Sequence, residues 1–222
     1  MTSTIVTAFD DTASDPPVRG FLHRPEPSGP DSGTGLVLTH GAGANCQSPL
    51  LVALAEAFCK SGFTVLRCDL PFRQLRPHGP PHNSATQDQS GLRAAVDALR
   101  QLGLSRIVLG GHSYGGRQAS MLAASEPGLV EALLLLSYPL HPPRRPDQLR
   151  TQHWPHLQTP ALFVHGARDS FGSLDEMTAA LALIPARMQL LPVESAGHEL
   201  LNPRNRAALP PLIVQAFRTF LE

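Results

Sequence analysis

The sequence is poor in the features that mark disulfide-rich and membrane-spanning proteins. Its three cysteines, Cys46, Cys59 and Cys68, are odd in number and lack the C-x-x-C spacing of a metal site. No run approaches the roughly 18 apolar residues of a transmembrane helix. The longest candidate, residues 129–140, is shorter and contains Glu131. Because the first residues also lack a basic start and an apolar segment, we expect reduced thiols and a cytoplasmic protein.

The sequence also lacks an excess of charge of either sign. Eighteen basic residues balance eighteen acidic ones, and the isoelectric point is near 7.2. General electrostatic binding to nucleic acid or to a membrane surface needs a basic excess, so we expect neither partner. Lysine is almost absent, since Lys60 is the only one. The glycine-rich stretch 109–116 therefore contains no Gly-Lys-Ser/Thr, and a phosphate-binding loop is not expected there.

Ten histidines raise the question of a metal site. The tightest pairs are His78 with His82 and His153 with His156, but neither pair is joined by cysteine or carboxylate residues at metal-ligand spacing. We interpret these residues as solvated loop histidines and expect no bound metal.

Short β-forming runs alternate with amphipathic stretches, which is typical of a mostly parallel sheet with helices on both faces. The length fits one α/β domain over residues 1–222, in which the first two strands are antiparallel. Residues 24–35 and 71–87 are expected loops, rich in proline. The expected strands are 3–9, 18–24, 35–40, 63–69, 105–110, 130–137, 160–166 and 187–193. The expected helices are 48–62, 87–103, 114–128, 173–184 and 209–222.

Residues 109–116, LGGHSYGG, place one serine among four glycines between an expected strand and an expected helix. Gly111, Ser113 and Gly115 fit the G-x-S-x-G pattern of a nucleophile elbow. The glycines would let strand and helix approach closely, and the helix N-terminus favours a developing negative charge near the serine. A glycine-rich turn with an incidental serine is the alternative. The strand–turn–helix context favours a nucleophile.

A serine nucleophile needs a base, and the base needs an acid to orient it. Behind an elbow of this type the acid and then the histidine follow the serine along the chain. Asp169 follows the expected strand 160–166, and His198 follows the expected strand 187–193. Since parallel strands end at one edge of a sheet, the three residues predict a catalytic triad. Five other acids are less well placed to orient the histidine: Asp69, Asp175, Glu176, Glu194 and Glu199.

The negative oxygen of an acyl-transfer intermediate needs two backbone N–H donors, an oxyanion hole. One donor is expected from Tyr114, the residue after the serine. The other is expected from the sequence HGAGAN after strand 35–40, with Ala42 as first choice and Gly43 as second. The remaining candidate pocket residues are His40, Gly41, Phe72 and Arg73. A cluster of three arginines is either a solvated face or an anion site: Arg144, Arg145 and Arg150.

The stretches HGAGAN, GGHSYGG, FVHGARDSFG and AGHEL, in this order, resemble the α/β-hydrolase superfamily over about residues 35–222. Residues 137–157 and 159–173 more narrowly resemble a small family related to a human testis-expressed protein and a nuclear acetyltransferase-complex subunit, neighbours of the dienelactone hydrolases. The resemblance implies an α/β-hydrolase fold with eight strands, the second antiparallel, and neither metal nor organic cofactor. Dienelactone hydrolases use a cysteine nucleophile, where this chain has Ser113.

Together these observations predict hydrolysis of an ester, thioester or lactone of a small acyl substrate. Ser113 would attack, His198 would transfer the proton and Asp169 would orient the imidazole. About 22 residues, 138–159, join two of the expected strands, which is too short for a helical lid domain, so an open, shallow site is expected. The alternative is a catalytically silent scaffold or protein-interaction module. A scaffold has no need of all three triad residues together, which favours the enzyme.

Overall fold

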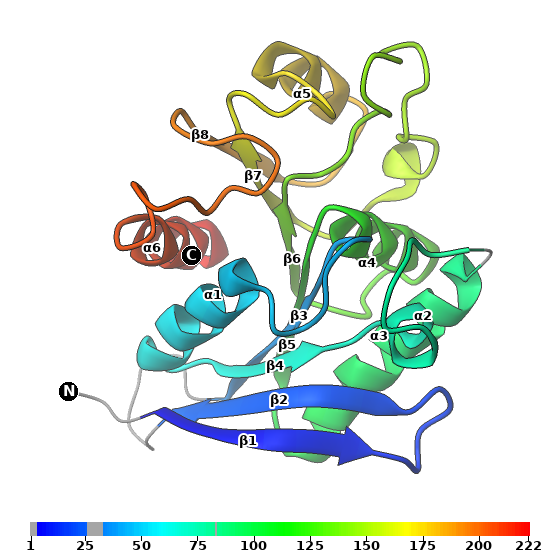
Figure 1. Cartoon of the computed structure of the whole chain (residues 1–222), viewed down its shortest axis with the longest axis vertical. Coiled ribbons are helices and arrows are strands. Elements are labelled where there is room, and N and C mark those ends of the chain that lie inside the picture. The colour runs from blue at the N-terminus through cyan, green and yellow to red at the C-terminus, as the bar shows by residue number, and fades with distance from the viewer. Residues whose placement is uncertain (1–3, 26–32, 83) are drawn as a thin grey trace.

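The computed structural model describes residues 4–25, 33–82 and 84–222. In this part of the chain eight strands form one sheet, in the order β1-β2-β4-β3-β5-β6-β7-β8 (Figure 1). β1 is antiparallel to β2 and β2 to β4, whereas the other pairs are parallel, as expected. The strands are β1 Thr4–Asp11, β2 Val18–Pro25, β3 Thr34–Thr39, β4 Thr64–Cys68, β5 Arg106–His112, β6 Ala132–Leu136, β7 Ala161–Gly166 and β8 Met188–Val193.

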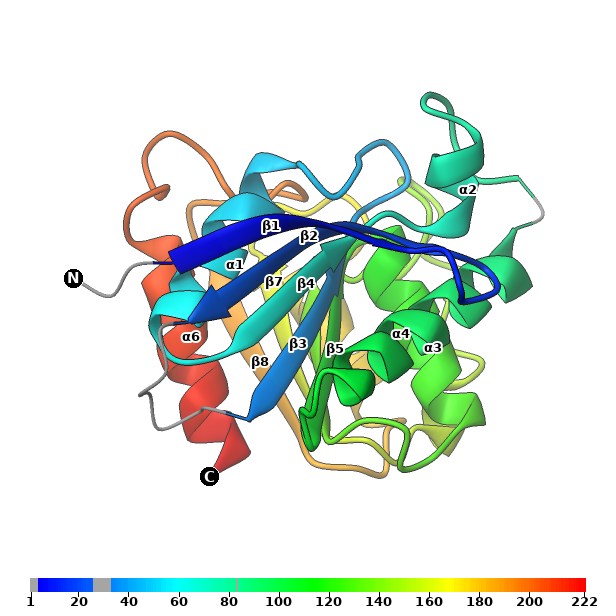
Figure 2. The same cartoon turned by 90° about the horizontal axis from the view of Figure 1, so that it is seen from below.

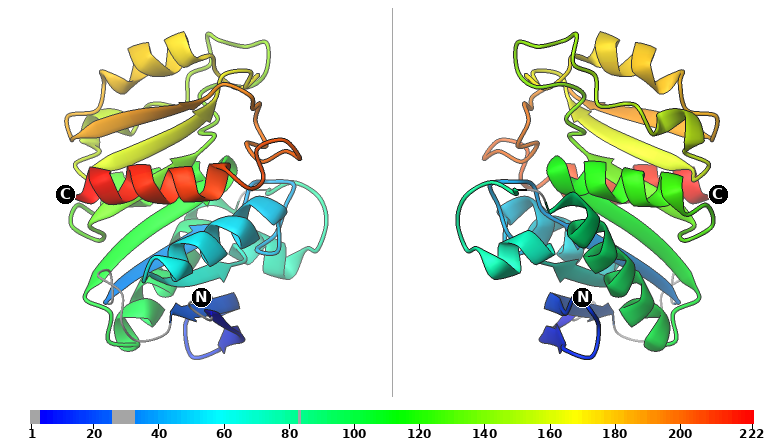
Figure 3. Two further views of the ribbon diagram at one scale, coloured as in Figure 1. Left: turned by 90° about the vertical axis from the view of Figure 1, so that its left-hand side faces the viewer. Right: turned by 90° about the vertical axis from the view of Figure 1, so that its right-hand side faces the viewer.

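Both faces of the sheet are buried under helices, because the central strands are apolar on both sides. Along β3, Leu36 and Leu38 face one hydrophobic core, and Val37 faces the other. Helices α1 and α6 cover the first face, and α3, α4 and α5 cover the second (Figures 2 and 3). These helices are α1 Pro49–Lys60, α3 Ala85–Gln101, α4 Tyr114–Ser125, α5 Leu174–Leu181 and α6 Leu209–Leu221. Within the described residues, no helix is both long and apolar enough to span a membrane.

The structure describes one of the two expected proline-rich loops in full apart from residue 83, and the other only in part. The expected loop 71–87 contains a short helix, α2 Pro71–Leu75, and α3 begins two residues earlier than expected. Both differences have local causes, because Pro71 suits the first turn of a helix and the Ser84 hydroxyl donates to Asp88 at 2.8 Å. Most of the other expected loop, 24–35, lies outside the described residues.

The connection between β6 and β7 is short, as the sequence predicted. Residues 137–160, all of which the structure describes, hold only the 3₁₀ helix Trp154–His156. No lid domain is inserted there.

The sheet has its topological switch point between β3 and β5. The chain leaves β3 toward β4 on one side and leaves β5 toward β6 on the other, although β3 and β5 are neighbours. Open α/β sheets bind ligands in the crevice that such a reversal leaves beyond the strand ends. The loop after β3 and the turn after β5 therefore mark the position of the site.

A buried histidine couples the fold to pH. His23 on β2 is 1% exposed, and its Nε2 accepts a hydrogen bond from Arg67 Nε on β4 at 2.8 Å. Burial, with a smaller contribution from the charge of Arg67, lowers the pKa of His23 to about 4. His23 is thus neutral in the folded protein at neutral pH.

We predict that stability falls as the pH is lowered from 6.5 to 4. The unfolded chain binds a proton at His23 near pH 6.5, while the folded chain does so only near 4. This costs the folded state roughly 3 kcal/mol at the acid end of the window. His23→Gln keeps an acceptor for Arg67 but does not titrate, so its free energy of unfolding in urea should fall less steeply. Equal pH dependence in both proteins would contradict the prediction.

Candidate active site

Ser113 occupies a sharp turn between β5 and α4. Its backbone has φ 51° and ψ −116°, a strained conformation for a residue with a side chain, and its N–H donates to Leu136 O at 2.8 Å. The neighbouring glycines are required sterically. A Cβ on Gly111 would lie 2.6 Å from Gly116 N, and one on Gly115 would lie 2.5 Å from His40 O. Side chains at these positions would force strand, helix and loop apart.

The structure brings Ser113, His198 and Asp169 together. His198 Nε2 lies 2.8 Å from Ser113 Oγ, and its Nδ1 lies 2.8 Å from Asp169 Oδ2 and 3.0 Å from Oδ1. An ionised carboxylate only accepts hydrogen bonds, so Nδ1 carries the proton. Nε2 is left to accept the hydroxyl proton of Ser113. This is the arrangement that a general base needs toward a serine nucleophile.

The environment of Asp169 keeps it ionised. Its side chain is fully buried, and burial alone would raise its pKa. The hydrogen bond and electrostatic attraction from His198, and the Phe171 N–H, which donates to Oδ1 at 2.8 Å, act in the opposite direction. Together they hold the pKa of Asp169 below its ordinary value, so it is a carboxylate at neutral pH.

The loops that carry Asp169 and His198 meet because Gly166, at the end of β7, has no side chain. A Cβ there would lie 2.4 Å from Gly197 O and 2.7 Å from Ala196 O. The Arg168 N–H also donates to Ala196 O at 3.0 Å. The histidine loop is thereby fastened directly to the aspartate loop.

Two residues at the site were not predicted from the sequence. His112 Nε2 donates to His198 O at 2.8 Å, and burial lowers the pKa of His112, so its ring is neutral. Phe171 stacks on the His198 ring, with 4.2 Å between ring centroids and 29° between planes. His112 fills an x position of G-x-S-x-G, where the motif sets no residue type, and its partner lies 86 residues away.

The candidate oxyanion loop lines a cavity in front of Ser113. The cavity has a volume of about 560 Å³, and Gly41, Ala42 and Gly43 form part of its wall together with Ser113 and His198. The structure thus places Gly41, Ala42 and Gly43 at the cavity, and their role as an oxyanion hole stays a prediction.

Arg73 was expected to line the cavity. The structure instead places it behind the candidate oxyanion loop, which it supports. Its guanidinium is buried and donates to Ala42 O at 2.7 Å, to Ala44 O at 2.8 Å and to Arg76 O and Gly79 O at 3.1 Å. Arg73 belongs to α2, which lies behind the candidate oxyanion loop, and from there its guanidinium reaches four carbonyl groups.

His40 and Phe72 were also expected to line the pocket, and the structure corrects both. His40 is fully buried beneath the loop, where Nδ1 donates to Gly41 O at 2.8 Å and Nε2 accepts from Leu70 N at 3.1 Å. Phe72 packs edge-on against the rings of His40 and Tyr114. Both side chains are part of the packing that supports the site.

Tyr114, the other expected oxyanion donor, is the first residue of α4. Its N–H has no partner in the helix ladder, as at the start of any helix. Its hydroxyl donates to Asp88 Oδ2 at 2.7 Å, and Asp88 also accepts from Phe72 N at 3.0 Å. Asp88 is fully buried in α3 and was not predicted. It ties the start of α4 to α2 and α3.

Several alternatives that the sequence left open have other roles. Asp69 accepts a hydrogen bond from Cys46 N at 2.7 Å, and Glu176 caps α5 in a capping box with Ser173. The cysteines are all buried and free, and burial raises the pKa of Cys46 to about 12, so its thiol is no nucleophile at neutral pH.

The histidines and arginines outside the triad also differ in role. His153 is not the solvated residue expected, because it is half-buried with Nε2 2.8 Å from Ser120 Oγ. Arg144 and Arg145 are exposed, while Arg150 is half-buried. In the described part of the chain, no group of three or more His, Cys, Asp or Glu residues could hold a metal ion.

Comparisons with known proteins agree with this architecture. The alpha/beta hydrolase domain family matches residues 32–210. A dienelactone hydrolase from Anabaena variabilis has a similar structure, with a TM-score of 0.77 and 22% identity over 99% of both chains. XC6422 from Xanthomonas campestris, described as an α/β serine hydrolase without a lid, has a TM-score of 0.70 and 16% identity over 99% of this chain and 96% of that one. The expected α/β-hydrolase fold is thereby confirmed.

Two curated relatives match part of the chain. The sn-1-specific diacylglycerol lipase ABHD11 of Mus musculus is 38% identical over 87 residues, 38% of this chain and 26% of that protein. An esterase/lipase-named protein of Haemophilus influenzae is 32% identical over 102 residues, 46% of this chain and 33% of that protein. The matches thus span a third or less of these relatives' own lengths. The narrower resemblance to the testis-expressed family stays a prediction.

We predict that His112 sets the reactivity of Ser113 by holding His198. His112→Phe keeps the ring but removes the N–H that binds His198 O, so covalent labelling of Ser113 by a fluorophosphonate should slow about tenfold. The exposed His156 provides the control, because His156→Phe should label at the wild-type rate. An unchanged rate in His112→Phe would show that the contact does not matter.

We predict that Arg73→Lys slows the same labelling reaction by about ten- to a hundredfold. An ammonium cannot hold the carbonyls of Ala42 and Ala44 as a guanidinium fork does, so the oxyanion loop loses its support. Arg76→Lys, on an exposed neighbour, is the matched control. Labelling rates are compared at one temperature, where circular dichroism shows that all proteins are folded. Equal rates in the three proteins would refute the supporting role.

Proposed function

The chain belongs to the alpha/beta hydrolase domain family, and from this we propose that it is a serine hydrolase that cleaves an ester, thioester or lactone of a small acyl substrate. One observation carries the proposal: His198 hydrogen-bonds Ser113 Oγ with one ring nitrogen and the buried Asp169 with the other, each at 2.8 Å. The esterase and lipase names of the curated relatives support an ester as substrate.

In the first step Ser113 Oγ attacks the carbonyl carbon of the substrate. The hydroxyl proton passes to His198 Nε2, and Asp169 stabilises the imidazolium that forms. The carbonyl oxygen becomes an oxyanion, for which Ala42 N–H and Tyr114 N–H are the proposed donors. The N-terminus of α4 adds its positive end at the same place.

The intermediate then collapses to an acyl-enzyme. His198 gives its proton to the leaving oxygen or sulfur, and the bond from that atom to the acyl carbon breaks. Water attacks the ester of Ser113 in the second half-reaction, with His198 again accepting and returning one proton. The products are a carboxylic acid and an alcohol or thiol, and water is the only reactant besides the substrate.

The cavity in front of Ser113 has room for a small acyl group and is reached without a lid. The connection between β6 and β7 holds no helical lid, so the cavity of about 560 Å³ is open to solvent. The chain would work as a single domain over residues 1–222. Its free, buried cysteines suit the reducing cytoplasm as the site of action.

The proposal predicts stoichiometric labelling of wild type by a fluorophosphonate, read by intact mass. Ser113→Ala and His198→Ala should not be labelled. Asp169→Asn should lose about 10⁴ in kcat for ester hydrolysis, because the imidazole takes the wrong tautomer. Ser90→Ala, the same change on the exposed face of α3, should behave as wild type. A folded wild type that stays unlabelled would refute the proposal and favour the scaffold.

A further inference from the structure

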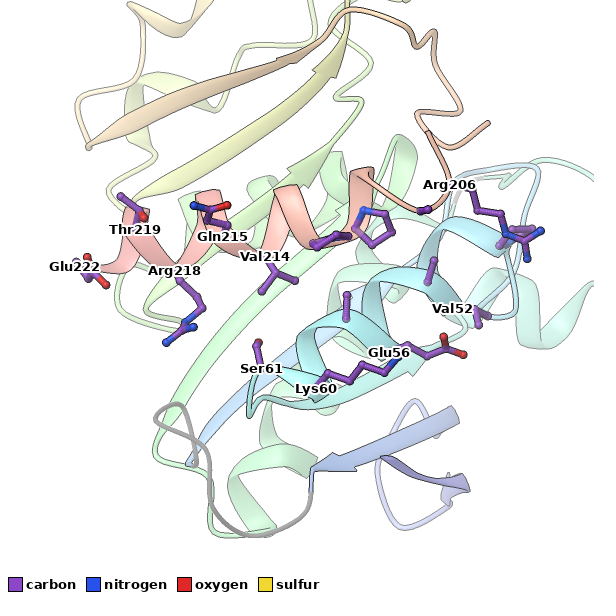
Figure 4. A pocket seen from close by; sticks show the side chains of 16 residues that line it. Val52, Glu56, Lys60, Ser61, Arg206, Val214, Gln215, Arg218, Thr219 and Glu222 are labelled. Atoms are coloured by element: carbon purple, nitrogen blue, oxygen red, sulfur yellow. The ribbon is translucent and has the colours of Figure 1, made fainter. Parts of the chain in front are cut away.

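A long groove runs between α1 and α6 on the face of the sheet that these helices cover (Figure 4). Its volume is about 1070 Å³. The helices touch beneath it, where the rings of Phe58 and Phe217 meet edge-on at 5.8 Å. In Figure 4, Val214 and Arg218 point from α6 toward α1. The groove therefore lies above a packed pair of helices.

The groove adjoins the candidate active site. Pro49, the first residue of α1, lines both the groove and the cavity in front of Ser113. The opposite walls also belong to one segment, since Leu201 lines the site cavity and Arg206 lines the groove. Seen along the sheet, the N-terminal end of α1 and the segment before α6 lie at the same edge (Figure 3). The site cavity and the groove therefore meet at Pro49.

The lining of the groove suits a neutral, unbranched alkyl chain. Half of its sixteen lining residues are small or apolar, and Ser61, Gln215 and Thr219 are polar and uncharged. The small or apolar residues are Pro49, Val52, Ala53, Ala57, Ala207, Pro210, Pro211 and Val214. The charged residues that line it carry both signs: Glu56, Lys60, Arg206, Arg218 and Glu222. Mixed charges give no field that selects an acidic or a basic partner, whereas the apolar surface gains from covering methylene groups.

The two walls of the groove lead back to different parts of the site. The α1 wall follows the candidate oxyanion loop, and the second wall is the continuation of the loop that carries His198, through Leu201 and into α6. In the proposed reaction His198 donates its proton to the leaving oxygen, so the leaving group lies on that side. The acyl part of the substrate then stays in the cavity near the oxyanion loop.

We propose that the groove between α1 and α6 binds the alkyl chain of the alcohol part of an ester substrate. The inference rests on the proposed function and adds a substrate class: esters of small acids with long-chain alcohols. From Pro49 to Lys60 the helix rises roughly 17 Å. An extended chain of about 13 carbons has that length, because C–C bonds of about 1.5 Å advance it by about 1.3 Å each.

The test measures kcat/KM for alkyl butyrates from ethyl to dodecyl, as acid released below the concentration at which the esters aggregate. In wild type kcat/KM should rise about twofold per methylene, since half-burial in an open groove recovers half of the roughly 0.8 kcal/mol per CH₂. Ala53→Trp fills the groove and Val52→Asp puts a charge into it, so both should flatten the rise. Ala179→Trp, on the exposed side of α5 across the sheet, should keep the wild-type slope and rates.

The outcomes distinguish failure of the proposed function from failure of the groove proposal. If ethyl butyrate is not hydrolysed and the folded protein resists the fluorophosphonate, the proposed function itself fails. If ethyl butyrate is hydrolysed but the slope is flat, or unaltered in both groove variants, only the groove proposal is overturned. A second series, nitrophenyl esters of lengthening acids, identifies the chain that is bound. A rise in that series alone would also overturn the assignment to the alcohol.

Discussion

The close approach of β5 and α4 at Ser113 is the constraint on which the rest of the site depends. The strained turn can exist only where Gly111 and Gly115 leave room for the neighbouring backbone. It puts the serine hydroxyl at the sheet edge beside the switch point of the strand order, and it starts a helix immediately behind it. Strain of this kind persists only when the surroundings over-determine the conformation. Here buried hydrogen bonds provide that rigidity.

The supporting groups form two sets, each fastening one loop. Arg73 and His40 hold the carbonyls of the oxyanion loop from beneath. His112 and Gly166 bring the histidine loop against the elbow and the aspartate loop. These groups are buried, and each contacts backbone atoms of a distant segment. The site is thus rigid through backbone contacts, and its side chains meet at hydrogen-bonding distance without a lid closing over them.

The sequence predicted the order and type of the strands well, because short apolar runs mark the strands and glycine and proline mark their ends locally. It also predicted that Ser113, Asp169 and His198 would meet, since each follows a parallel strand at one edge. It placed Arg73, His40 and Phe72 in the pocket, because a position after a strand does not reveal which side of a loop a residue faces. That depends on α2, a five-residue helix inside an expected loop. The role of His112 depends on a contact 86 residues away, which no local pattern encodes.

The central claim is that Ser113 carries the acyl group during turnover, and rapid acid quench during hydrolysis of a nitrophenyl ester tests it most directly. Peptide mass mapping of the quenched enzyme should find the acyl group on the peptide containing Ser113, at an occupancy that rises before steady state and decays when substrate is exhausted. Turnover with no acylated peptide, or with the acyl group on another residue, would contradict the account.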